Sequence, residues 1–91
     1  MNQPQHTRSS NRELVELQVS DRTPESIVEL IARQLDRADE AHERIRREGS
    51  VVRDMKGSVI PHPAIAVEIT ATKLASDLLT KNKHGRTRGE V

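Results

Sequence analysis

Histidine is the residue type in this chain best suited to catalysis or metal binding, and its spacing supports neither. The four histidines stand at positions 6, 42, 62 and 84, without the short intervals that join the ligands of a zinc site. His42 lies three residues from Asp39, but no second histidine follows one helical turn later. A lone histidine of this kind is ordinarily a partly buried structural residue, and we interpret His42 in that way.

Other catalytic and cofactor-binding patterns are also absent from the sequence. The chain has no cysteine, which excludes thiolate metal ligands and disulfides. It has no glycine-rich phosphate loop and no serine nucleophile motif. We therefore expect a protein without catalytic residues, metal or cofactor. A metal enzyme using His42, His62 and nearby carboxylates is the least favoured alternative.

The second group of chemically distinctive residues is a cluster of cations near the C-terminus. Lys81, Lys83, Arg86 and Arg88 fall within eight residues, beside one acid, Glu90. Such side chains bind the DNA backbone by displacing its counterions, without reading its sequence. The same pattern is typical of a solubilising chain end, or of cations that favour the C-terminus of a helix. The sequence leaves these interpretations open, and the four residues are our predicted DNA-binding residues, with Arg8 and Arg12 as further candidates.

Size and composition limit the core that could position these residues. The chain has 91 residues, a net charge of +1, and no Phe, Tyr or Trp. Without aromatic residues it cannot form the stacking platforms that bind single-stranded nucleic acid. A core of Ile, Leu, Val and Ala in so small a domain is marginal alone, so we expect oligomerisation. No segment reaches the roughly 18 apolar residues of a membrane span, and the first dozen residues do not resemble a signal peptide, so we expect a cytoplasmic protein without a membrane partner.

The pattern along the chain predicts three parts. Residues 1–22 form a polar N-terminal segment whose apolar part, 13–19, fits a short helix or a strand equally well. Residues 23–80 form a helical hairpin that mediates oligomerisation. Residues 81–91 form a basic, disordered tail. The predicted fold class is all-α: an antiparallel hairpin of two long helices with an ordered connector that can form a β-hairpin.

The first long helix is predicted over residues 24–48. Thr23 is expected to be its N-cap and Pro24 its first helical residue, while Gly49 suits the position that ends it. Apolar residues then recur at alternating spacings of three and four, the pattern of a helix packed along a partner. This stripe comprises Val28, Ile31, Leu35, Ala38, His42 and Ile45.

The connector and the second helix follow. Asp54–Gly57 is expected to make a tight turn, and Pro63 to open the second helix with His62 as its cap. The second helix shows two apolar stripes. One stripe contains Ala64, Val67, Ala71, Leu74 and Leu78, and the other contains Ile65, Ile69, Thr72, Ser76 and Leu79.

A face that wide exceeds what one helix can cover, so we expect one stripe to pack on the first helix and the other on another copy. The predicted oligomer interface is formed by Val28, Ile31, Leu35, Ile45, Ile65, Val67, Ile69, Leu74, Leu78 and Leu79.

Residues 48–79 resemble the small subunit of phage terminase. In that family a helix ends in glycine, a short connector contains a second glycine, and an Asn-Pro pair opens an amphipathic helix. The matching residues here are Glu48-Gly49, Val51-Val52, Gly57, His62-Pro63-Ala64-Ile65 and the helix through Leu78-Leu79. The likeness covers about residues 25–80. His62 stands where the family usually has Asn, and the Gly-Leu-Ser/Thr-Pro ending is absent.

The resemblance implies a DNA-packaging role. A terminase small subunit forms a homo-oligomeric ring through helical hairpins, binds viral double-stranded DNA, and regulates the large terminase subunit without catalytic residues of its own. The alternative from a different class is a small helical protein-interaction adaptor, or antitoxin-like module, that makes no DNA contact. The nearly balanced charge of the central region favours that alternative.

Overall fold

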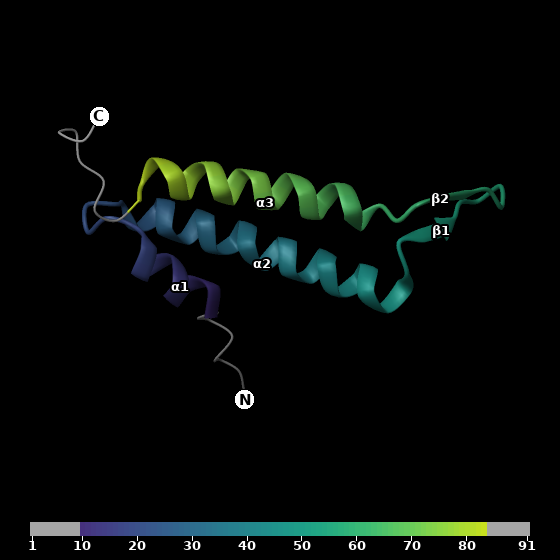
Figure 1. Ribbon diagram of the computed structural model, residues 1–91, viewed down its shortest axis with the longest axis horizontal. Coiled ribbons are helices and arrows are strands. Elements are labelled where there is room, and N and C mark those ends of the chain that lie inside the picture. The colour runs from purple at the N-terminus through teal and green to yellow at the C-terminus, as the bar shows by residue number, and fades with distance from the viewer. Residues whose placement is uncertain (1–9, 84–91) are drawn as a thin grey trace.

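A computed structural model describes residues 10–83, which form three helices and one small sheet. The elements are α1 (Ser10–Gln18), α2 (Glu25–Glu48), β1 (Val51–Arg53), β2 (Val59–Pro61) and α3 (Ala64–Lys81). The two long helices lie side by side and antiparallel, α1 packs against α2 near its N-terminal end, and the two strands project from the opposite end (Figure 1). The predicted mostly helical fold and the pairing of two long helices are confirmed.

The first long helix ends at the predicted residue but starts one residue later than predicted. Pro24 has extended dihedral angles, φ −58° and ψ 145°, so it occupies the N-cap position and not the first helical position. The predicted Thr23 cap is wrong: its hydroxyl is buried and has no hydrogen-bond partner among the described residues. At the other end Gly49 adopts φ 93°, and its N–H donates to the Ile45 carbonyl at 2.7 Å. A positive φ of this kind favours glycine, and the predicted helix end is confirmed.

Alanines form the contact between the two long helices. Ala38 and Ala41 of α2 are buried, and so are Ala64, Ala71 and Ala75 of α3. Because alanine ends at its Cβ, the two backbones can approach closely along this line. We call these five residues the alanine seam.

The stripe predicted for α2 is largely confirmed as an intramolecular surface. Val28 and Ile31 are buried, and Leu35 and Ile45 are half-buried. The interpretation of His42 as partly buried is wrong, because its side chain is exposed and its Nδ1 lies 3.1 Å from Glu68 Oε2.

The prediction that one stripe of the second helix packs on α2 is confirmed only in part. In the first stripe Ala64 and Ala71 are buried and Leu78 packs against the core, whereas Val67 and Leu74 are exposed. The face toward α2 includes Ala75, which neither predicted stripe contained. Ile31 of α2 and Ala75 of α3 belong to one buried cluster, so a bulky residue packs beside a small one there. Leu78 and Leu79 of α3 pack against this cluster, whereas Val67, Ile69 and Leu74 are exposed.

The first helix completes the core. Val15 of α1 and Val19, just after it, join Val28, Ile31 and Ala75 in one cluster of buried residues. The segment for which helix and strand were both open is therefore helical through Gln18. Ser10, Asn11 and Arg12, from the predicted polar N-terminal segment, form the first turn of this helix.

Polar contacts fix α1 on α2. Asn11 donates to the carboxylates of Asp36 and Asp39, each at 2.8 Å. Arg12 forms ion pairs with Glu25 and Glu29 of α2. These contacts cross between two helices, so they hold α1 in register with the first half of α2.

We predict that Ala75→Leu lowers the free energy of unfolding by about 1–3 kcal/mol, because three extra carbons would have to fit into a fully buried position. Chemical denaturation monitored by circular dichroism measures the change. Ala66→Leu is the matched control, since Ala66 is an exposed residue of the same helix. Equal stability of the two variants would contradict the alanine seam.

Candidate functional site

The connector is an ordered β-hairpin, which we call the arm (residues 51–61). Its strands pair antiparallel, with Val51 opposite Pro61, Val52 opposite Ile60 and Arg53 opposite Val59. The Asp54 carboxylate accepts hydrogen bonds from the backbone N–H groups of Lys56 and Ser58, both at 2.9 Å. Gly57 completes the turn with φ 87°. The predicted tight turn is confirmed, and its carboxylate-to-backbone bonds hold the tip in one conformation.

His62 joins the arm to both long helices. Its side chain is 2% exposed, and its Nδ1 accepts the N–H of Ala64 at 2.9 Å. Because Nδ1 is an acceptor, a neutral ring carries its proton on Nε2, which donates to Glu48 Oε1 at 2.7 Å. Pro63 already has helical dihedral angles, φ −57° and ψ −26°. His62 is therefore the N-cap of α3 as predicted, and it also anchors the last residue of α2.

The sequence did not predict that Glu48 is the partner of His62. Fourteen residues separate the two, and no helical or strand period relates them. The hydrogen bond from His62 is the main reason that the pKa of Glu48 lies below the ordinary glutamate value, and Arg44 adds a smaller electrostatic contribution. Glu43 has a pKa lowered in the same way by its hydrogen bond with Arg46, which lies at 2.9 Å.

The predicted interface residues fall into three environments. Val28 and Ile31 are buried inside the chain, so they leave no surface for another copy. The exposed group consists of Val67, Ile69 and Leu74. The half-buried group consists of Leu35, Ile45, Ile65, Leu78 and Leu79.

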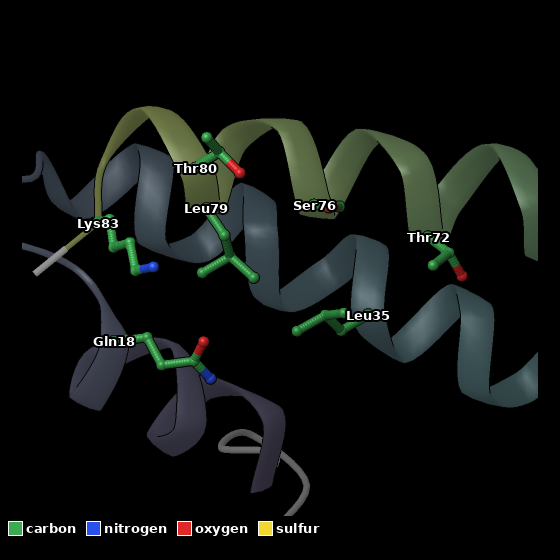
Figure 2. A pocket seen from close by; sticks show the side chains of 7 residues that line it. All are labelled: Gln18, Leu35, Thr72, Ser76, Leu79, Thr80 and Lys83. Carbon is green, nitrogen blue, oxygen red and sulfur yellow. The ribbon is translucent and has the colours of Figure 1, made fainter.

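An open groove runs beside α3 where the three helices meet. Its volume is about 480 Å³, and Figure 2 shows Leu35 and Leu79 from the two long helices with Gln18 across from them on α1. Thr72, Ser76 and Thr80 of α3 and Lys83 complete the lining. The groove thus follows part of the second predicted stripe of α3.

Two of the four predicted DNA-binding residues lie within the described part of the chain. Lys81 is exposed in the last turn of α3, and Lys83 is exposed and forms an antiparallel bridge with Val19. Arg86 and Arg88 lie outside the described residues. Arg12, a further candidate, is paired with glutamates and so is a structural residue.

The charges of the folded part do not form an excess of cations. Acidic and basic residues are nearly equal in number over residues 10–83. Within that range no cluster of three or more His, Asp or Glu residues is arranged to hold a metal ion. The helices described there include none of the length and apolarity needed to cross a membrane.

Comparisons with protein-family models, with curated proteins and with solved structures find no match to this chain.

We predict that His62→Ala lowers the free energy of unfolding by about 1–3 kcal/mol, because a helix cap is removed and the Ala64 N–H is left buried without a partner. His62→Asn should cost less, since asparagine is a strong N-cap. Chemical denaturation of both variants gives the comparison. His42→Ala, at an exposed position, is the control and should change little; a destabilisation equal to that of His62→Ala would contradict the capping role.

The lowered pKa of Glu48 gives a pH dependence with a defined sign. A carboxylate whose pKa is lower in the folded state stabilises the fold above its ordinary pKa, about 4.3 for glutamate. That stabilisation disappears as the pH falls through the lower, folded pKa. Glu48→Gln should therefore flatten the decline in unfolding free energy below about pH 4.3 relative to the parent. Parallel pH profiles of the two proteins would show that Glu48 contributes nothing.

Proposed function

We propose that this protein is a non-catalytic DNA-packaging subunit of the terminase small subunit type, which assembles from several copies and binds double-stranded DNA. The observation that carries the proposal is the aliphatic surface left uncovered on α3. Val67, Ile69 and Leu74 are exposed there, on a helix whose contact with α2 already uses the alanine seam. Exposed aliphatic residues that share one helix face, as Val67 and Leu74 do, are typical of an interface.

The position of these residues supports a ring. With 3.6 residues per turn, Val67 and Leu74 lie to one side of the alanine seam on α3 and Ile69 lies to the other side. A stripe on one copy can therefore contact a different stripe on the next copy, and repetition of such a head-to-tail contact closes a ring when the rotation permits.

The DNA contact is assigned to the C-terminal cations, Lys81, Lys83, Arg86 and Arg88. The near balance of charge over residues 10–83 supports this assignment, because the folded part offers no excess of cations. The large terminase subunit is the proposed protein partner, and its ATPase and nuclease activities would supply the chemistry. The resemblance of residues 48–79 to the family supports that role.

We predict that the parent protein is a discrete oligomer larger than a dimer at micromolar concentration. Leu74→Asp should reduce its mass while preserving helix content, because position 74 is exposed in a single copy and a buried unpaired charge is costly. Light scattering and circular dichroism measure the two properties. Lys73→Asp, one residue away and exposed, is the control. A parent protein with the mass of one chain would contradict the proposal.

We also predict that deleting residues 84–91 weakens binding to duplex DNA and leaves the oligomer intact. The cut follows Lys83 because that residue bridges Val19, and the neighbouring Asn82 carbonyl accepts the Ser20 N–H at 2.8 Å. For every DNA phosphate that the shortened protein no longer neutralises, the slope of log affinity against log salt should become shallower by about 0.9. Fluorescence anisotropy at several salt concentrations gives the slope.

An adaptor without DNA contact is the second candidate, favoured by the same charge balance of the folded residues. Oligomerisation without duplex DNA binding at low salt would select it over the packaging subunit. Unchanged DNA affinity after the deletion would instead show that DNA binds outside residues 84–91.

A further inference from the structure

Two apolar surfaces on this chain have opposite charge at their rims and lie at opposite ends of the molecule. One is the arm and the other is the outer side of α1. Figure 1 shows α1 beside the N-terminal half of α2, and the arm beyond the far end of α2. The arm therefore cannot fold back onto α1 of its own chain.

The arm has an apolar face with cations around it. Val51 and Val59 lie on the same face of the hairpin and are more than half exposed, and Met55 at the tip is completely exposed. Arg53 shares that face, where its guanidinium donates to the Gly57 carbonyl, and Lys56 stands beside Met55. The acid of the turn, Asp54, accepts hydrogen bonds from two backbone N–H groups within the turn, and the two cations outnumber it.

The outer side of α1 is an apolar ridge with acids around it. Leu17 is 75% exposed and Leu14 is 49% exposed. Glu13 precedes them in the helix, and Asp21 lies in the turn that follows the helix; both acids are exposed. We call Glu13, Leu14, Leu17 and Asp21 the α1 ridge. Arg12 does not neutralise it, because its guanidinium is bound by Glu25 and Glu29 of α2 and by Glu16.

The arm is also preorganised, because hydrogen bonds fix both its turn and its base. A two-stranded hairpin alone in water is marginally stable, but here the turn is fixed by Asp54 and the base by His62, whose backbone N–H donates to the Ser50 carbonyl at 2.8 Å. Preorganisation of this kind lowers the entropic cost of binding. Methionine at the tip suits such a contact because its unbranched side chain adapts to irregular apolar surfaces.

From these observations we infer that the arm of one copy docks on the α1 ridge of a second copy, with Met55 and Val59 against Leu14 and Leu17. The partner is another copy of this chain because charge and apolarity are complementary between two surfaces that one chain cannot bring together. The contact joins different surfaces of the two copies, so it propagates from copy to copy and is compatible with a ring. This inference rests on the proposed self-assembly and assigns a pair of surfaces to it.

A complementation experiment tests the pairing. Met55→Glu disables the arm and leaves the ridge, and Leu17→Lys disables the ridge and leaves the arm; both positions are solvent-exposed, so folding should persist by circular dichroism. Each variant alone should have a lower mass than the parent protein. An equimolar mixture should be heavier than either variant alone, because a competent arm then meets a competent ridge. Ser26→Glu, at an exposed position in the first turn of α2, should keep the parent mass.

Cysteine cross-linking provides a second measurement, since the chain contains no cysteine. A chain with both Met55→Cys and Leu17→Cys should give a ladder of disulfide-linked copies under mild oxidation, and chains with either substitution alone should not. Parent-like mass in both charge variants, or a mixture no heavier than the separate variants, would overturn the docking. Those results leave the packaging proposal intact, whereas a parent protein of single-chain mass would overturn both.

Discussion

The close contact of α2 with α3 through alanines is the constraint on which the rest of the structure depends. The buried alanines pair the helices, and Leu35, Leu78 and Leu79 pack against the core beside them. Val67, Ile69 and Leu74 remain exposed. A core built in this way contains no aromatic residue and few large side chains, and Ile31 and Val15 are the largest that are completely buried. Such a core gains little from burial per residue, which is why association between copies is an expected source of stability.

The junction at His62 connects this packing to the shape of the molecule. One imidazole caps α3 through Nδ1 and binds Glu48 at the end of α2 through Nε2, while the backbone of the same residue closes the base of the arm. The direction in which the arm leaves the helical hairpin is therefore set by the hydrogen bonds of a single residue. An asparagine could replace the cap, but its shorter side chain would not be expected to reach Glu48 as well.

Much of the local structure could be predicted from the sequence because it depends on neighbouring residues. The end of α2 follows from Gly49, the turn of the arm from Asp54 and Gly57, and the start of α3 from His62 and Pro63. The face of α3 that meets α2 could not be predicted in this way, because hydrophobicity ranks leucine and valine above alanine as buried residues. Which residues are buried between two helices depends on the distance between the helix axes. That distance is set by the packed pair of helices and not by either helix alone.

The predicted interface and DNA-binding residues were also only partly predictable from the sequence. The stripe of α2 could be predicted from its spacing, but Val28 and Ile31 are buried in the core together with Val15 of α1. The role of Arg12 could not be anticipated, because Glu25 and Glu29 come near it only after α1 turns back along α2. The basic residues near the C-terminus can be read directly from the sequence. Their assignment to DNA contact depends on the family resemblance and on the charge balance of the folded residues.

The central proposal is that copies of the folded chain associate, and the dependence of thermal stability on protein concentration tests it most directly. Binding between folded copies stabilises the folded state by mass action. The account predicts that the unfolding midpoint rises steadily as the protein concentration is raised about a hundredfold. A midpoint that stays constant over that range would contradict it.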